Sequence, residues 1–300
     1  DYDDALKIVK LNAIIYDENG EEIKKYRRSD FEDVSAVSDF SLYEDSRIKY
    51  LNFTPTAYPY TIEFNCVVSS QNTAHFPFWR PLEGYYISTE SSVFEVEYSN
   101  EVGVNLKERN FENFQIINKS SEGKIHYSAQ NIKAFSQEQM SPAFREISPM
   151  VFVSPKVFHY EGYEGRSEDW KNLGKWMYDE MLSDRTELPE ATKSKILRLV
   201  QGVDDPLDRA KIVYKYVQEN TRYISVQEGI GGIQPIAAEQ VDQVKYGDCK
   251  GLTNYTKALM DVVDVPANYT RVYASDTNQD VDEVMSISIA TYHLTIEYLL

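Results

Sequence analysis

The segment 245-KYGDCKGLTNYTKAL-259 has the residue pattern in this chain that is best suited to chemistry. Cys249 follows Gly247 and Asp248 and begins a stretch in which apolar and aromatic residues recur at helical spacing. These residues are Leu252, Tyr255 and Leu259. The pattern predicts a helix that starts at the cysteine. Unpaired backbone N–H groups and the positive end of the helix dipole favour a thiolate there, and thiolate is the nucleophilic form of cysteine.

The neighbours of Cys249 also fit a nucleophile. Lys250 adds a positive charge, and Gly247 and Gly251 would let a substrate backbone approach closely. A lone cysteine is often a small buried hydrophobic residue instead, and the residues alone leave this alternative open.

Length and composition limit the class of protein. A chain of 300 residues exceeds what one hydrophobic core usually supports, so we expect two domains. Hydrophobic residues make up 42% and charged residues 26%, which is the composition of a folded protein. The 31 basic and 48 acidic residues give a formal net charge of −17, which disfavours nucleic acid and anionic membranes as partners.

No apolar run reaches the roughly 18 residues that a membrane-spanning helix needs, so we expect no transmembrane segment. The first residues, DYDDALKIVK, contain neither an initiator Met nor an apolar signal region, and we therefore expect a trimmed start. A trimmed start fits an exported protein, and it fits a shortened expression product equally well.

The two cysteines, Cys66 and Cys249, permit at most one disulfide and no CxxC metal site. Cys66 shares one face of an alternating strand with Ile62, Phe64 and Val68, which predicts a core position. The histidines show no HxH or HExxH spacing, so we expect no bound metal and no cofactor. They are His75, His126, His159 and His293.

The first half of the chain, from Leu6 to about Gln130, predicts short strands that form an antiparallel β-sandwich. Strand 6–16 is followed by the turn residues 17–20 and by EEIKKYR, which is the pattern of a β-hairpin. Further strands are predicted at 60–69, 92–98, 111–118 and 124–130.

The aromatic segment AHFPFWRPLEGYY, residues 74–86, surrounds Trp79. Its rings either pack onto the sandwich or form a platform for a carbohydrate or a peptide, and packing is the more common case. Prolines and glycines between Pro142 and Trp170 predict a linker. We place the β-rich domain at 1–155 and the second domain at 156–300.

Helices are predicted to dominate the second half. Ser167 is the expected N-cap of a helix that carries Trp170 and Leu173 on one side, with Met177 and Met181. A second helix is predicted from about Pro189 to Gly202. A third begins after Asp205, and its expected core stripe is Ala210, Val213, Tyr214 and Val217.

Strands are predicted after the cysteine helix, at 268–275 and 291–300. Cysteine catalysis needs an imidazole within about 3 to 4 Å of the sulfur, to hold the thiolate and to protonate the leaving amine. His293 on the last strand is the candidate, and a surface histidine on an edge strand is an equal alternative. Candidate oxyanion donors are the Cys249 backbone N–H and the Gln234 side chain, which is otherwise a turn residue before Pro235.

The segments YVQENTRYISVQEGIGGIQP, 216–235, and YGDCKGLTNYTKAL, 246–259, resemble the transglutaminase-like, papain-related domain of bacterial proteins that carry a DUF3857 domain in front of it. The β-rich first half is similar to that DUF3857 domain. The resemblance implies an α+β fold, in which an N-terminal antiparallel β-sandwich precedes a transglutaminase-like α+β domain. It implies Cys249 as nucleophile, completed by a His on a downstream strand and an Asp on the next strand. It also implies export to the periplasm or the cell surface of a Gram-negative bacterium.

Two features differ from the family pattern. Members tend to show an Asn-His pair before an apolar strand, whereas Thr291 and Tyr292 precede His293 here. The sequence ends at Leu300, before a further strand that could carry the aspartate. We therefore expect either that the domain continues past these residues, in which case the catalytic His could be another residue, or that the triad is degenerate.

Two functions follow as hypotheses. The leading one is a cysteine-dependent amide hydrolase or acyl transferase, protease-like or transglutaminase-like, that acts on a protein or peptide through a thioester at Cys249. The alternative is a catalytically inactive transglutaminase-like module for binding or assembly. A third hypothesis is a sugar-binding lectin that uses the Trp79 region. The substrate, the choice between hydrolysis and transamidation and the oligomeric state stay open at this point.

Overall fold

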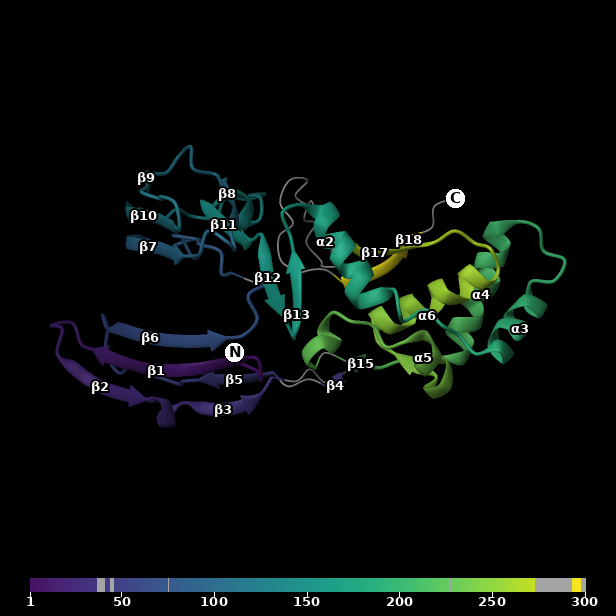
Figure 1. Cartoon of the computed structure of the whole chain (residues 1–300). Helices are drawn as coiled ribbons and strands as arrows, with labels where there is room; N and C mark the ends of the chain where they lie inside the picture. Colours follow the sequence, from purple (N-terminus) through teal and green to yellow (C-terminus); the bar gives the residue numbers. More distant parts are fainter. Residues whose placement is uncertain (37–40, 44–45, 75, 227, 273–292, 298–300) are drawn as a thin grey trace. The chain divides into compact units, whose positions relative to one another are not determined.

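The computed structural model describes residues 1–36, 41–43, 46–74, 76–226, 228–272 and 293–297. His75 and residues 273–275 of the predicted strand lie outside this part. The fold is α+β, with strands in the first half of the chain and most helices in the second half (Figure 1). The described residues form two compact units. The first unit consists of 1–72, 178–272 and 293–297, and the second of 73–177.

The first unit opens with an antiparallel sheet of three strands. Strand β1 (Leu6–Tyr16) lies between β2 (Glu22–Arg27) and β6 (Thr61–Ser70). The predicted hairpin is confirmed, because Tyr16 pairs with Glu22 across a turn in which Gly20 has a φ of +80°. Short strands follow, with a 3₁₀ turn at Arg28–Asp30; they are β3 (Glu32–Ser35), β4 (Ser41–Tyr43) and β5 (Arg47–Tyr50).

The prediction that Cys66 shares one face of its strand with Phe64 is confirmed, but the prediction that Cys66 is buried is not. In the register of β1 and β6, Cys66 stands opposite Leu11 and Phe64 stands opposite Ala13, so all four residues share one side of the sheet. Leu11 and Ala13 are buried there, whereas Cys66 is exposed and Phe64 is 59% exposed. The predicted core position of Cys66 is therefore wrong, because β6 is the edge strand of this sheet.

The second unit contains the remaining sheets of the first half. Its strands are β7 (Thr89–Glu97), β8 (Val104–Arg109), β9 (Ile116–Asn118), β10 (Lys124–Ile132), β11 (Met150–Pro155), β12 (Val157–Tyr160) and β13 (Tyr163–Arg166). They pair as β7-β10-β9, β8-β11 and β12-β13, and the helical turn α1 (Phe144–Ile147) precedes β11. Two predictions are wrong here. The strand expected at 111–118 is reduced to β9, and the expected linker forms β11 to β13, in which Val151 and Val153 are buried.

Trp79 belongs to the core of the second unit. Its side chain is 5% exposed, and its Nε1–H donates a hydrogen bond of 2.8 Å to Ser92 Oγ. The rings of Phe94 and Tyr127 lie beside the indole, with centroids 6.4 and 6.0 Å away. The packing interpretation of the aromatic segment is confirmed for Trp79, and a ring covered in this way argues against the lectin hypothesis.

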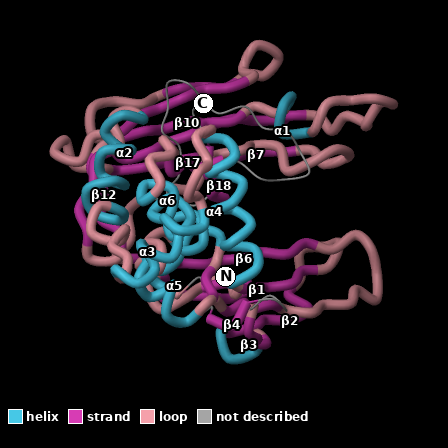
Figure 2. Tube along the Cα trace, turned by 90° about the vertical axis from the view of Figure 1, so that its right-hand side faces the viewer, coloured by secondary structure: helices cyan, strands magenta, loops and turns pink. Residues whose placement is uncertain are grey.

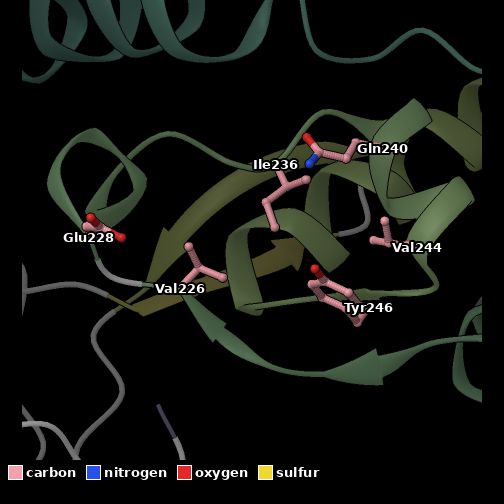
Figure 3. Close-up of a pocket in the computed structure, with 6 residues that line it drawn as sticks. All are labelled: Val226, Glu228, Ile236, Gln240, Val244 and Tyr246. Carbon is pink, nitrogen blue, oxygen red and sulfur yellow. The ribbon is translucent and has the colours of Figure 1, made fainter. Parts of the chain in front are cut away.

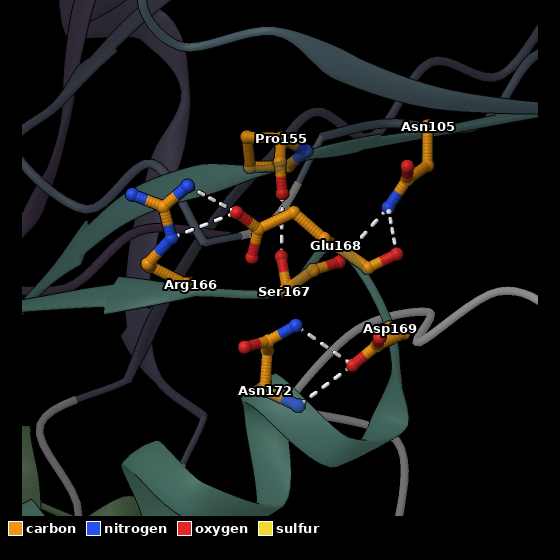
Figure 4. A network of polar contacts seen from close by, with 7 residues as sticks. All are labelled: Asn105, Pro155, Arg166, Ser167, Glu168, Asp169 and Asn172. Atoms are coloured by element: carbon orange, nitrogen blue, oxygen red, sulfur yellow. Dashed lines mark hydrogen bonds and ion pairs between the residues drawn. The ribbon is translucent and has the colours of Figure 1, made fainter.

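A polar network leads from the strands into helix α2 (Trp170–Trp176) (Figure 4). Asp169 is the N-cap, because its Oδ1 accepts the Asn172 backbone N–H at 2.7 Å. Ser167, the predicted N-cap, donates its hydroxyl to the Pro155 carbonyl instead. The prediction failed by two residues because Asp and Ser have similar capping preferences. A π-helical turn, Met177–Leu182, follows α2 and buries Met177 and Met181.

Four helices of the first unit share one hydrophobic core. They are α3 (Glu190–Leu199), α4 (Pro206–Asn220), α5 (Ala238–Val244) and α6 (Cys249–Val262). Figure 2 shows α3, α4 and α5 around α6. In α4 the predicted stripe is correct except at Tyr214, which is 52% exposed, while Tyr216 takes a buried position. Every described helix is too short or too polar to span a membrane.

Short elements lie between these helices and after the last of them. They are β14 (Arg222–Tyr223), β15 (Ser225–Val226), the 3₁₀ turn Gly229–Gly232, β16 (Tyr246–Gly247), β17 (Asn268–Val272) and β18 (His293–Glu297). β14 and β16 pair in parallel, β15 pairs in parallel with β4, and β17 and β18 form an antiparallel pair.

Asp242 ties three of the helices together from within the core. This residue of α5 is 8% exposed, and its carboxylate accepts hydrogen bonds from Tyr255 Oη at 2.6 Å, Thr192 Oγ1 at 2.8 Å and Lys245 Nζ at 2.8 Å. Burial raises the pKa of Asp242, but the hydrogen bonds from Lys245, Tyr255 and Thr192 outweigh it and lower the pKa below its usual range.

We expect Asp242→Asn to lower the free energy of unfolding by about 2 kcal/mol at pH 7, because buried donors on α3 and α6 lose an anionic acceptor. The lowered pKa in the folded state means that Asp242 stabilises the fold above its unfolded pKa and stops doing so as the pH falls through the folded value. The difference from wild type should therefore stay constant from pH 7 down to about pH 5 and shrink below about pH 4. Urea unfolding at each pH measures it.

Glu239→Gln is the matched control, because Glu239 is an exposed carboxylate on the same helix. Its unfolding free energy should follow that of wild type. A difference for Asp242→Asn that does not change with pH would contradict the proposed role of the charge.

Candidate active site

Cys249 is the first residue of α6, as the sequence predicts, and the residue is partly exposed. The helix begins here because Asp248 is its N-cap: the Oδ1 atom accepts the Gly251 backbone N–H at 2.9 Å. Most other residues of the first turns are buried, and Leu252 is partly buried against the same core. The helix therefore presents the thiol at its N-terminal end while the rest of its length is packed.

Lys250 does not act as a free positive charge beside the thiol. Its ammonium forms an ion pair with Asp248, and it also donates to the Val226 carbonyl at 3.3 Å. Lys250 is 3% exposed and Asp248 is 1% exposed. The expected electrostatic help from Lys250 is thus largely cancelled by Asp248, and the pair holds the chain on both sides of Cys249 instead.

The two glycines of the motif face protein, not open space. A Cβ atom at Gly251 would lie 3.4 Å from Ile236 Cβ, and one at Gly247 would lie 3.4 Å from the Leu252 backbone nitrogen. Both glycines are buried. The expectation that they admit a substrate backbone is therefore wrong, because their open side is filled by α6 and by the segment before α5.

Two tyrosines flank the start of α6, and the sequence pattern did not indicate either. Tyr223 on β14 pairs with Gly247 on β16, two residues before Cys249. Burial raises the pKa of Tyr223, and the negative charges of Cys249 and Asp248 raise it further.

Tyr269 lies on β17, which packs against α6. Burial raises the pKa of its phenol; Arg271 opposes this effect, and the charges of Asp248 and Cys249 add to it. The phenol oxygen is buried, and it has no hydrogen-bond partner among the described residues. Both tyrosines therefore stay protonated near neutral pH, and the phenol of Tyr269 is a donor without an acceptor among the described residues.

His293 is the first residue of β18, where its backbone pairs with Val272 of β17. β17 and β18 both pack against α6, so the fold brings the strand of His293 to the helix of Cys249. The imidazole itself lies outside the described part of the structure. The pairing of Cys249 with His293 stays a prediction.

Gln234 follows the turn Gly229–Gly232, and its backbone N–H donates to the Ile230 carbonyl at 2.8 Å. Its side-chain Nε2 donates to the Glu180 carbonyl at 3.4 Å. Among the described residues, no hydrogen bond joins Gln234 to Cys249. Its role as an oxyanion donor therefore stays a prediction, and no direct contact with Cys249 supports it in the described part of the structure.

Both cysteines are free thiols. Within the described ranges, no group of three or more His, Cys, Asp or Glu side chains is placed to hold a metal ion.

Residues 1–136 match the family described as "Domain of Unknown Function with solved-structure structure (DUF3857)". The chain is similar in structure to a "putative protease" from Parabacteroides distasonis, with a TM-score of 0.66 and 14% identity over 99% of this chain. The likeness covers 56% of that protein, so this chain spans little more than half of its length. No curated protein matches.

A "putative cysteine protease" from Cytophaga hutchinsonii is also matched, with a TM-score of 0.29 and 12% identity over 70% of this chain and 68% of the other. A TM-score this low does not indicate a shared fold. The Parabacteroides protein shows that the α+β fold described above occurs in a solved structure. The match to DUF3857 confirms the expected assignment of the first 136 residues.

We expect Asp248→Asn to destabilise the protein by about 3 to 5 kcal/mol, because it leaves the buried Lys250 ammonium without its counter-ion. Asn can still cap the helix, so the loss reports the ion pair and not the cap. Replacing both residues, Asp248→Asn with Lys250→Met, should recover most of the loss. Urea unfolding of the four proteins of this cycle measures the coupling.

Asp169→Asn is the control for capping alone, since Asp169 is the exposed N-cap of α2. Its effect should stay below about 1 kcal/mol. Equal losses for Asp169→Asn and Asp248→Asn would mean that the ion pair does not carry the effect.

Proposed function

We propose that this chain is a cysteine-dependent amide hydrolase or acyl transferase that acts on a protein or peptide. The observation that carries the proposal is the partly exposed residue Cys249, held at the start of a buried helix by the Asp248 cap and the Asp248–Lys250 pair. A nucleophile needs a fixed position and access to solvent, and a cysteine that served only packing would not need the access. Hydrolysis is the preferred outcome over cross-linking.

The proposed reaction has two steps. The Cys249 thiolate attacks the carbonyl carbon of an amide, and the C–N bond breaks as an imidazolium, assigned to His293, gives its proton to the departing amine. The acyl group is then a thioester on Cys249. Water, or a second amine, then attacks the thioester carbonyl and transfers a proton to the imidazole. The C–S bond breaks, which regenerates the Cys249 thiolate and releases the carboxylic acid or the new amide.

The developing oxyanion needs donors. The Cys249 backbone N–H and Gln234 are proposed for this role from the sequence, and we add the buried phenol of Tyr269, which has no hydrogen-bond partner among the described residues, as a further candidate donor.

We also propose domain bounds and a location for this protein. We assign 1–155 to a DUF3857-like domain built as an antiparallel sandwich and 156–300 to a transglutaminase-like domain. The protein is proposed to be exported, to the periplasm or cell surface of a Gram-negative bacterium. Its net charge of −17 supports partners other than nucleic acid.

The second candidate is a catalytically inactive module for binding or assembly, with the β-rich part as its contact surface. One observation favours it, because the edge strand β6 exposes apolar side chains. They lie on the face of the sheet on which the β1 side chains are buried. Ile62 is 49% exposed, Phe64 59% and Val68 50%. Exposed apolar strips of this kind are typical of interaction surfaces.

Alkylation separates the two candidates, and Cys66 is an exposed thiol that serves as internal reference. If Cys249 is the nucleophile, iodoacetamide at about pH 6.5 should modify it at least tenfold faster than Cys66. His293→Ala should remove this advantage, since the imidazole holds the thiolate. Peptide mass spectrometry at short reaction times gives both rates in one sample.

His126→Ala is the control, because His126 pairs with Glu95 in the second unit. It should leave the ratio of the two rates unchanged. Equal rates for the two cysteines, unaffected by His293→Ala, would count against an enzyme and in favour of the binding module.

Tyr269→Phe tests the extra donor. We expect acylation of Cys249 by p-nitrophenyl acetate to slow by about a hundredfold, which is the effect of losing one oxyanion donor. The unfolding free energy should stay equal or rise by about 1 kcal/mol, because the substitution removes a buried oxygen without a partner. Tyr214→Phe, at an exposed position of α4, is the control. Unchanged acylation with reduced stability would assign Tyr269 a structural role only.

A further inference from the structure

A pocket of about 440 Å³ lies beside the cysteine motif in the first unit (Figure 3). Its lining residues come from β15, the turn that follows it, the segment before α5, α5 itself and β16; they are Val226, Glu228, Ile236, Gln240, Val244 and Tyr246. The volume suits one large side chain and its adjoining backbone, and not a whole folded partner.

The pocket wall contacts the residues on both sides of Cys249. The carbonyl of Val226 accepts a hydrogen bond from Lys250 Nζ, at 3.3 Å. Ile236 packs against Gly251, and Tyr246 precedes Gly247 on β16. A group seated in this pocket would therefore lie next to the first turn of α6, where the thiol is presented.

The lining combines apolar walls with one carboxylate. Val226, Ile236, Val244 and the ring of Tyr246 supply apolar surface. In Figure 3, Glu228 lies at one end of the pocket, while Gln240 and Val244 lie at the other. The Glu228 side chain is exposed and makes no hydrogen bond or ion pair with the residues that the structure describes. Its charge is thus available to a ligand.

We propose that this pocket selects a substrate residue with an aliphatic stem and a terminal cation, of the lysine or arginine type, next to the amide that Cys249 attacks. The stem lies along the apolar wall, and the ammonium or guanidinium meets Glu228. The net charge of −17 supports the same choice, because it attracts cationic segments and repels acidic ones. This inference rests on the proposed function, since it names the substrate class of that site.

The test uses the full chain with Cys66→Ser, so that Cys249 is the one thiol, and three chloroacetamides of equal length. Their tails end in an ammonium, a methyl and a carboxylate group. The rate of Cys249 alkylation, followed by intact-protein mass spectrometry, should be highest for the ammonium tail and lowest for the carboxylate tail. The ratio of ammonium to methyl rates should be about three- to fivefold, as expected of an ion pair at an exposed rim.

Variants assign the preference to the pocket. Glu228→Gln should bring the ratio of ammonium to methyl rates close to one, and Glu228→Lys should invert it. Val244→Trp should fill the apolar end and lower the rates of all long-tailed probes relative to unsubstituted chloroacetamide. Glu239→Gln removes an exposed carboxylate of α5 outside the lining and should keep the wild-type ratio.

Failure of this inference differs from failure of the proposed function. If Cys249 reacts readily with every tail at equal rate, the selectivity proposal is overturned and the nucleophile stands. If Cys249 is inert to all probes, the proposed function falls, but the pocket can still be tested by binding. Nα-acetyl-lysine amide and Nα-acetyl-norleucine amide are each titrated into the same chain, and the NMR shifts of the pocket amides measure their affinities. Equal affinity for the two amides would overturn it.

Discussion

The buried contact between Asp248 and Lys250 is the constraint on which the arrangement around Cys249 depends. One carboxylate caps α6 through the Gly251 N–H and also balances the ammonium of Lys250. Because the two residues are the chain neighbours of Cys249, neither can move without moving the thiol. A buried ion pair adds little net stability compared with an apolar pair of the same volume. Its value here lies in fixing the position of the thiol.

A second buried carboxylate supports the first. Asp242 on α5 joins α3 to α6 through Thr192 and Tyr255, and it does so a few residues before the chain turns into β16 and the cysteine motif. The Asn254 side chain adds a hydrogen bond of 2.6 Å to the Arg185 carbonyl from the next part of α6. Polar side chains that are fully paired inside a core restrict how the helices can pack. Hydrogen bonds made by residues before and after Cys249 therefore hold the start of α6 in place.

The features that were predictable from the sequence are local ones. The hairpin at residues 17–20, the start of α6 at Cys249 and most of the α4 stripe follow from turn residues, capping and helical spacing within one segment. The failures depend on distant contacts. Cys66 is exposed because β6 is an edge strand, and Lys250 is neutralised because it folds back on Asp248. Tyr223 comes to the cysteine motif only through the pairing of β14 with β16, and Tyr269 only through the packing of β17 against α6. No short sequence pattern encodes those arrangements.

The elements around the thiol also relate the two candidate functions to each other. Cys249, the pocket and Tyr223 all come from residues 222–251, whereas the proposed base comes from β18, which reaches α6 by pairing with β17. A change in the last strand would remove the proton transfer and leave the pocket and the thiol in place. An inactive binding module and a cysteine enzyme therefore require no difference in the fold of this segment. They differ in whether an imidazole and its carboxylate partner complete the site, so the reactivity of Cys249 is the property that distinguishes them.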